Sequence, residues 1–152
     1  MESQLYILLD VLITTVLCAV IGFEREEKSK PAGLRTNMIV GGASCLIVSL
    51  IIPLIDFMQQ NNISEVITTD PIRIIDAIVV GVSFIGAGTI LKKGANKIEG
   101  LTTAATLLYS LGIGICIALK QYYIAVGITV LVVIINFIFS KIAATFSDKK
   151  ND

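Results

Sequence analysis

The chain has 152 residues and a formal net charge of zero, and 55% of its residues are apolar while only 16% are charged. Soluble domains carry roughly 25% charged residues, so this composition excludes an ordinary soluble domain. A net charge of zero gives no indication of a nucleic-acid partner, and none is expected. Only short connections and two brief tails remain outside the apolar runs, so we expect one membrane domain over residues 1–152 and no soluble domain.

Five apolar runs follow one another along the chain, and each has the roughly 20 residues that a helix needs to cross a bilayer. They lie at about 5–23, 36–55, 72–91, 100–119 and 122–140. The sequence therefore predicts an all-α, polytopic membrane protein with five transmembrane helices.

The basic residues alternate between the polar segments that flank these runs. From the first tail to the last, the segments carry 0, 4, 1, 3, 1 and 3 lysines and arginines, which accounts for all twelve. Positively charged loops stay in the cytoplasm, so the pattern predicts an N-terminus outside and a C-terminus in the cytoplasm. The first run has no basic residue before it and no small-residue cleavage pattern after it, which argues against a secretory signal.

The connection after the first run holds the densest charge cluster in the chain, within 22–36. Glu24 is expected just after the first helix and Arg35 just before the second, so each has the unfavourable sign for the helix dipole. We expect them to pair with each other or with charges on another helix or subunit, while Thr36 caps the second helix. The stretch is then a structural clamp or a contact surface for a partner or ligand. Its candidate residues are Glu24, Arg25, Glu26, Arg35 and Thr36.

The predicted third helix has a clear start, with Asp70 as N-cap and Pro71 at the first helical position. Its later half is rich in small residues spaced four apart, which let helices approach closely within the chain or in a homodimer. The alternative is a locally broken helix whose carbonyl groups coordinate an ion. The candidate packing residues are Ala77, Gly81, Ser83, Gly86, Ala87 and Gly88.

Two carboxylates inside the predicted spans are candidate cation ligands, Asp76 in the third and Asp10 near the outer end of the first. Asp76 lies three residues after Arg73 and shares a helix face with Ser83 and Ala87, so we expect that face to point into the bundle or a water-filled cavity. Arg73 and Asp76 either form a local pair that anchors the helix at the interface, or contribute to a cation or proton site open to the outside.

The fourth predicted helix opens with Thr102 and Thr103, which can bond to carbonyl groups of their own helix or of a neighbour. The connection before it, 92–99, is basic and contains Asn96 as a further candidate; it is either a plain loop or a contact for anionic lipid or a partner. Three cysteines fall inside apolar runs, where they act as small hydrophobic residues, and there is no histidine. No catalytic or metal-ligand arrangement is found, so we expect no enzyme.

Four blocks of residues together carry a family resemblance. They are Gly22-Phe-Glu-Arg-Glu with Lys30-Pro-Ala-Gly-Leu-Arg-Thr36, Asp70-Pro-Ile-Arg73, Gly81-Val-Ser-Phe-Ile-Gly-Ala-Gly-Thr89, and Gly100-Leu-Thr-Thr-Ala-Ala105. In these blocks, their order and their spacing, the chain resembles the MgtC/SapB family of bacterial inner-membrane proteins.

The resemblance implies a multi-pass protein of the bacterial cytoplasmic membrane with five helices and an outward N-terminus. It also implies a role in growth at low magnesium and in survival of pathogens inside macrophages, exerted by restraining the F-type ATP synthase rather than by carrying magnesium. The expected partners are the lipid bilayer, a second copy of the chain and that synthase. No cofactor is expected beyond Mg²⁺ itself. The alternative function is transport of magnesium or another cation, along a path within the bundle or at a dimer interface.

The chain departs from the family pattern in several respects. Ala77 stands where the family often has glutamine, Glu99 where arginine is common, and Leu108 where tryptophan is common. A role that rests on those side chains would not transfer to this chain. Many family members also have a cytoplasmic ACT-like C-terminal domain, which we expect this chain to lack.

Overall fold

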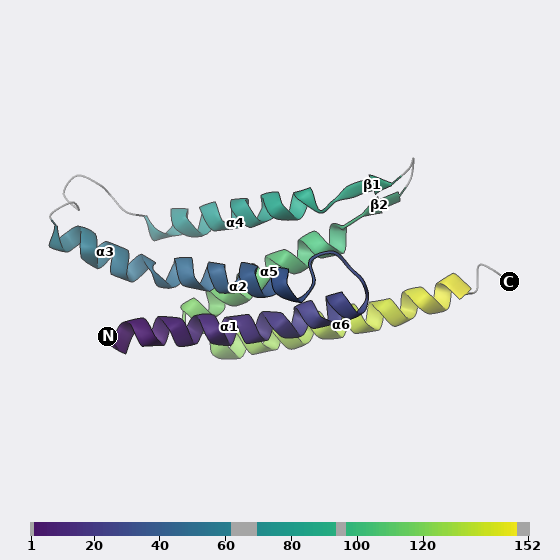
Figure 1. Ribbon diagram of the computed structural model, residues 1–152, viewed down its shortest axis with the longest axis horizontal. Coiled ribbons are helices and arrows are strands. Elements are labelled where there is room, and N and C mark those ends of the chain that lie inside the picture. The colour runs from purple at the N-terminus through teal and green to yellow at the C-terminus, as the bar shows by residue number, and fades with distance from the viewer. Residues whose placement is uncertain (1, 62–69, 94–96, 149–152) are drawn as a thin grey trace.

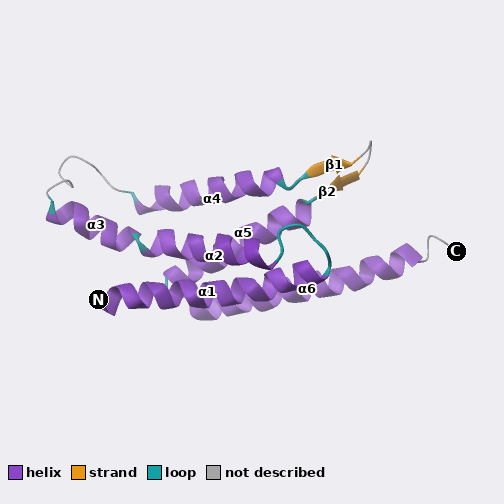
Figure 2. Ribbon diagram, viewed as in Figure 1, coloured by secondary structure: helices purple, strands orange, loops and turns teal. Residues whose placement is uncertain are grey.

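The computed structural model describes residues 2–61, 70–93 and 97–148 (Figure 1). Helices make up nearly all of it, with one short pair of strands, as Figure 2 shows. In chain order the elements are α1 (Glu2–Glu27), α2 (Leu34–Ser49), α3 (Ile51–Gln60), α4 (Pro71–Gly88), β1 (Leu91–Lys93), β2 (Lys97–Glu99), α5 (Leu101–Ala118) and α6 (Tyr122–Asp148).

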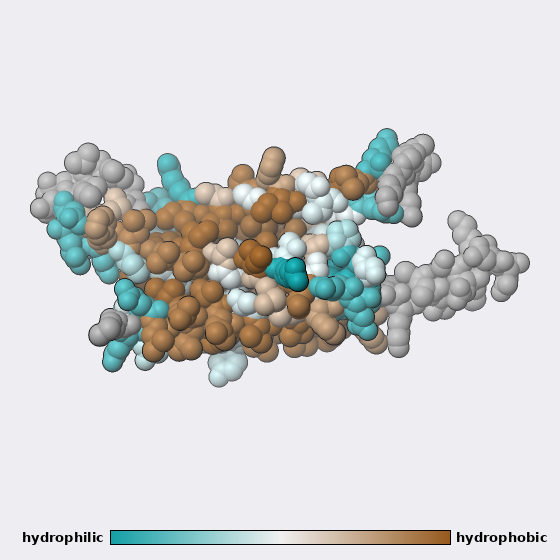
Figure 3. All heavy atoms as spheres, viewed as in Figure 1, coloured by the Kyte–Doolittle hydropathy of each residue, from teal (hydrophilic) through white to brown (hydrophobic). Residues whose placement is uncertain are grey.

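The helices form a membrane-type bundle. Four described helical runs are long and apolar enough to cross a bilayer, namely Glu2–Glu27, Leu34–Gln60, Pro71–Gly88 and Leu101–Ala118, and the described apolar part of α6 is shorter, Tyr122–Ile138. Figure 3 shows a hydrophobic band over the middle of the molecule and hydrophilic residues toward both ends. The prediction of an all-α polytopic membrane protein is confirmed, while the direction in which the chain crosses the membrane stays a prediction.

The connections lie at two opposite ends of the bundle (Figure 1). One end holds the α1–α2 connection and the β1–β2 pair, and we call it the hairpin end. The other holds the start of α1 and the short α5–α6 turn, and we call it the N-terminal end. This arrangement agrees with the separation of connections that the basic residues predict.

The connection between the first two helices is shorter than predicted. α1 continues past residue 23 to Glu27, and α2 begins at Leu34 rather than at 36. Glutamate, arginine and lysine are good helix formers, so the charge cluster extends α1 until the turn residues that follow it. Glu24 and Arg25 therefore lie in the last turns of α1, and Arg35 lies in the first turn of α2.

The second helical run bends instead of ending near residue 55. Leu50 separates α2 from α3, and the run continues to Gln60. Pro53 lies in the first turn of α3, where its ring removes one backbone donor and pushes against the preceding turn. The break at Leu50 is the expected position of such a kink.

The third predicted helix ends three residues early. α4 is unbroken from Pro71 to Gly88, so a locally broken helix is not observed, and Leu91 pairs with Glu99 in the antiparallel strands that follow. Gly100 then turns the chain into α5 with φ +94, and a Cβ there would collide with the carbonyl group of Thr89. Glycine suits this turn because the left-handed region is open to it.

The core lies where α1, α2 and α5 meet. Cys18 of α1, Cys45 of α2 and Ile113 of α5 are fully buried in one cluster. Gly41 of α2 and Gly114 of α5 allow the closest approach, because a Cβ on Gly114 would strike the Gly41 carbonyl oxygen. α4 packs along one side of α5, and only 11% of its apolar window is buried, against 44% for α5.

We expect Gly114→Ala to lower the free energy of unfolding by about 1–3 kcal/mol, because the added methyl group must push two helix backbones apart. Gly112→Ala is the matched control, since a Cβ there meets no atom within 4 Å. Alanine at that position should be neutral or slightly stabilising. Thermal unfolding of the purified variants in detergent measures both effects, and equal midpoints for the two would contradict the close contact.

Candidate functional site

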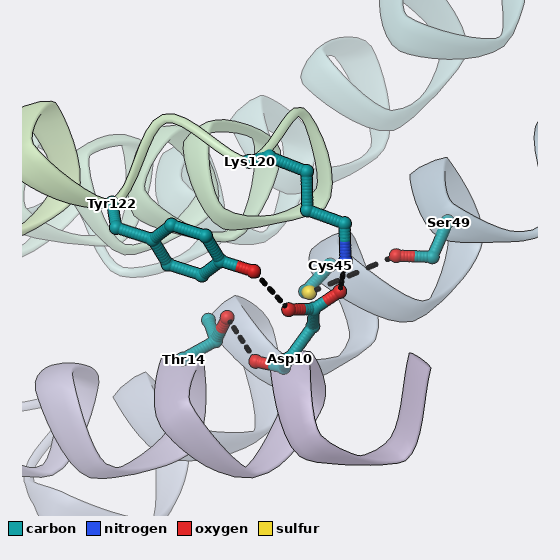
Figure 4. Close-up of polar contacts among 6 residues, drawn as sticks. All are labelled: Asp10, Thr14, Cys45, Ser49, Lys120 and Tyr122. Atoms are coloured by element: carbon teal, nitrogen blue, oxygen red, sulfur yellow. Dashed lines mark hydrogen bonds and ion pairs between the residues drawn. The ribbon is translucent and has the colours of Figure 1, made fainter. Parts of the chain in front are cut away.

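Buried polar side chains gather in two places along α1. At the N-terminal end they surround Asp10, and Figure 4 shows this Asp10 cluster. At the hairpin end they surround Glu24 and Arg25, and we call them the hairpin cluster. Both clusters join α1 to helices that come more than 70 residues later in the chain.

Asp10 is 3% exposed, and two donors from the α5–α6 turn satisfy its carboxylate. The Lys120 ammonium group forms a salt bridge with Oδ2, and the Tyr122 hydroxyl donates to Oδ1 at 2.8 Å. Lys120 has a positive φ of 61°, and the tight turn around it brings both donors over α1 (Figure 4). A cation at Asp10 would have to displace the chain's own lysine.

The contact with Asp10 keeps the Lys120 ammonium group charged over a wide pH range. The hydrogen bond to Asp10 raises the pKa of Lys120 above its ordinary value, and burial opposes this only in part. The stability contributed by this lysine is therefore fully present below its ordinary pKa and is lost only as the pH rises through the raised value. Lys120 is therefore charged at neutral pH.

Thr14, Cys45 and Ser49 line the inner side of the Asp10 cluster. The Thr14 hydroxyl donates back to the Asp10 carbonyl at 2.8 Å, which is a bond within α1. Cys45 and Ser49 lie one turn apart on α2, with Sγ and Oγ separated by 4.0 Å. Their polar atoms therefore face one another and the Asp10 side chain, as Figure 4 shows.

In the hairpin cluster, Glu24 connects α1 to α6. Its carboxylate accepts from Lys28 at 2.5 Å and from the Asn136 side-chain amide at 2.9 Å. Lys28 also donates to the Asn136 carbonyl at 3.1 Å, which closes a ring of three residues. Of the two alternatives for Glu24 and Arg35, pairing with each other is wrong, because Glu24 contacts Lys28 and Asn136 while Arg35 lies exposed in the first turn of α2.

Arg25 is a buried cation beside this ring. It is 4% exposed, and its guanidinium donates to the Thr103 hydroxyl of α5 at 2.6 Å. Its Nε has no hydrogen-bond partner among the described residues. The last turn of α1 favours a positive charge, but a buried guanidinium without full hydrogen bonding costs free energy. Thr102, the neighbouring candidate, is exposed.

The α1–α2 connection is held in one conformation by side chains on both sides. Glu26 accepts from the Leu34 backbone amide at 2.9 Å and caps α2, so the expected cap by Thr36 is wrong. Asn37 donates to the carbonyl groups of Ala32 and Gly33 at 2.6 and 2.9 Å. Its Oδ1 accepts from Ser110 of α5 at 2.8 Å, which anchors the connection to the core.

This connection encloses an open cleft of about 590 Å³ at the hairpin end. Two basic side chains and two hydroxyl groups lie among the residues that line it. They include Glu26, Ser29, Lys30, Gly33, Arg35 and Thr36. The cleft thus combines apolar surface from Pro31 and Leu34 with two basic side chains, Lys30 and Arg35, and one acidic side chain, Glu26.

The candidate residues of α4 are placed differently from the prediction. Asp70 caps the helix by accepting from the Ile72 amide at 3.0 Å, and its other oxygen lies 3.9 Å from Nε of Arg73. The expected Arg73–Asp76 pair is replaced by this exposed contact. The face that carries Asp76 does not point into the bundle. Val82 and Gly86 are the buried residues of α4, whereas Asp76, Ala77, Gly81, Ser83, Ala87 and Gly88 are exposed.

The sequence analysis missed several partners in these clusters, and one candidate, Asn96, lies outside the described residues. The pairing of Lys120 with Asp10 could have been inferred, since the predicted topology puts both residues at the same end of the bundle. Asn37 and Ser110 are polar residues inside apolar runs, a pattern that requires an internal partner. Among the described residues, no group of three or more His, Cys, Asp or Glu side chains could hold a metal ion.

Thr103→Val should destabilise the bundle by about 1–3 kcal/mol, because it removes the hydroxyl group that accepts from the buried Arg25 guanidinium. Thr102→Val has the same change in shape at an exposed position and should stay within about 0.5 kcal/mol of the parent. Unfolding midpoints in detergent compare the two. A loss in both variants would assign the effect to the start of α5 rather than to the Arg25 contact.

Tyr122→Phe should lower the stability by about 1–2 kcal/mol, because a carboxylate acceptor at Asp10 loses one donor. The control is Tyr123→Phe, whose ring is 96% exposed. Scanning fluorimetry at neutral pH measures the difference. The bond would be unimportant if the two variants unfold at the same temperature.

Comparison with known proteins places the chain in a family. The model of the MgtC family matches residues 11–145, which is most of the chain. Protein MgtC of Salmonella typhimurium is 36% identical over 137 residues, covering 90% of this chain and 53% of its own length. Protein SapB of Bacillus subtilis is 41% identical over 109 residues, covering 72% of this chain and 46% of its own.

YhiD of Escherichia coli, whose name describes it as a candidate magnesium transporter, is 33% identical over 139 residues, covering 91% of this chain and 63% of its own length. The chain thus spans about half to two thirds of the length of these relatives. No solved structure matches it. On the family match and these identities, the chain belongs to the MgtC family of membrane proteins.

Proposed function

We propose that the chain is a regulatory protein of the bacterial inner membrane that acts in adaptation to low magnesium by contacting another membrane protein. The observation that carries this proposal is a surface at the hairpin end that exposes two basic side chains and is held by side-chain hydrogen bonds to its own backbone. There, Lys30 on the α1–α2 connection and Arg35 in the first turn of α2 are exposed, and Glu26 and Asn37 form hydrogen bonds with the backbone of the connection and the start of α2.

A fixed loop is suited to recognition. Because the loop loses its conformational entropy during folding and not on binding, more of the contact free energy contributes to the affinity for a partner. The hydrogen bond between Arg25 and Thr103 supports this loop from below. Arg25 belongs to the first of the family's sequence blocks and Thr103 to the fourth. The surface is therefore attached directly to the core through α5, and a partner bound there contacts a rigid element.

The partner we propose is the F-type ATP synthase, whose activity the chain would restrain when magnesium is scarce, including during survival inside host cells. The family membership supports this choice, together with the basic character of the hairpin end, which the positive-inside rule assigns to the cytoplasm. On this view no side chain acts as a catalytic group, and the effect follows from contact alone.

Transport of magnesium or another cation is the second candidate. It is favoured by the name of YhiD and by the carboxylates within the spans. The geometry favours it less, because Lys120 and Tyr122 already occupy both oxygens of Asp10, and Asp76 lies on the outer side of α4. A magnesium ion would be the substrate in this case, not a resident cofactor.

Crosslinking in native membranes tests the regulatory function. A photoreactive amino acid at Pro31 should capture a membrane protein, and Arg35→Glu should reduce the yield at least about tenfold by reversing one contact charge. Glutamate in the first turn of α2 suits the helix dipole, so folding should be unaffected. Lys92→Glu, at the same end but on β1, is the matched control and should retain the product.

The functional readout is ATP-driven proton pumping in inverted membrane vesicles. The parent chain should lower the pumping rate, and Arg35→Glu should relieve that effect. Unchanged pumping, with no captured partner, would overturn the proposal. If, in addition, liposomes with the purified chain and a magnesium-sensitive dye show protein-dependent flux, cation transport takes its place.

A further inference from the structure

We propose that two copies of this chain associate in the membrane through the outer face of α4, with Arg73 and Asp76 of each copy paired to Asp76 and Arg73 of the other. This inference does not depend on the function proposed above, since it concerns a different surface from the hairpin end.

Among the described residues, no element covers the outer face of α4. The helix rests on α5 through Val82 and Gly86, and Figure 1 shows it at the edge of the bundle. On the opposite side the side chain of Arg73 is 86% exposed, and Val80 and Phe84 are 68% and 81% exposed.

Lipid is a poor partner for this face. Asp76 is the sixth residue of an 18-residue helix, so it lies well over one turn inside the span. Ser83 lies two turns further along the same side. A carboxylate that faces hydrocarbon is energetically unfavourable, and such groups almost always face other protein groups or water. A protein surface with a matching cation satisfies Asp76 better than acyl chains do.

A second copy supplies that cation at the required depth. Two copies inserted in the same direction are related by a two-fold axis along the membrane normal, so their α4 helices run parallel and each contact occurs twice. Arg73 and Asp76 differ in depth by only about 4.5 Å, three residues of helix rise. An arginine side chain spans this distance, and both unlike-charge contacts form together.

The competing contacts of these two residues are weak. Arg73 lies 3.9 Å from Asp70, with both side chains largely exposed, and such pairs contribute little. The same face carries the small residues Ala77, Gly81 and Gly88. A Cβ added to Gly81 or to Gly88 would meet no atom within 4 Å. Small residues at this position let two helix backbones approach closely.

Cysteine crosslinking in native membranes tests the interface. Val80→Cys lies at the centre of the proposed face, and Val16→Cys is a matched control on the exposed side of α1. The native Cys18 and Cys45 are buried, and the partly buried Cys116 is replaced by alanine in both variants. A short thiol crosslinker should convert Val80→Cys to a dimer of the chain at least about tenfold more efficiently than Val16→Cys.

Charge exchange tests the pairing itself. Arg73→Asp in the Val80→Cys background should lower the dimer yield at least about tenfold, because like charges then face each other. Adding Asp76→Arg should restore it. Equal yields from Val80→Cys and Val16→Cys, a product that contains a different protein, or a failure of the exchanged pair to restore the dimer would each overturn the proposal.

Discussion

The contact between Gly41 of α2 and Gly114 of α5 sets the position of nearly every buried polar group at the hairpin end. Because the two backbones touch there, the next turn toward the hairpin end brings Asn37 to within 2.8 Å of Ser110. Two turns further along α5, Thr103 meets Arg25 of α1. A short apolar contact thus determines a series of hydrogen bonds that no local sequence rule would place.

The two clusters on α1 satisfy the same membrane constraint to different degrees. Lipid offers no partner to polar groups, so each must be matched within the protein. Asp10 is matched in full by a lysine and a tyrosine, whereas Arg25 keeps one nitrogen without a partner among the described residues. The Asp10 cluster therefore stabilises the packing of α1 against the α5–α6 turn. An additional hydrogen bond would stabilise the protein most at Arg25, whose Nε has no partner among the described residues.

The sequence was sufficient to predict the class of fold and the start of α4, but it predicted few of the contacts between helices. Hydropathy and length identify membrane helices because lipid imposes both, and Asp70 caps α4 through a bond to a residue two positions away. The helix-dipole argument failed for Glu24 and Arg35, because both lie inside helices: α1 continues to Glu27 instead of residue 23, and α2 begins at Leu34 instead of residue 36. The predicted orientation of α4 was wrong, because the helix packs on α5 through Val82 and Gly86 and not through the side that carries Asp76.

The bond between Asp10 and Lys120 also has a consequence for how the protein is made. Its two partners are 110 positions apart, so Asp10 enters the membrane with the first helix long before Lys120 leaves the ribosome. This partner of the carboxylate is available only when the α5–α6 turn reaches the same end. This salt bridge therefore forms after the first five helices have been synthesised, whereas the contacts of Glu24 and Lys28 with Asn136 also require α6.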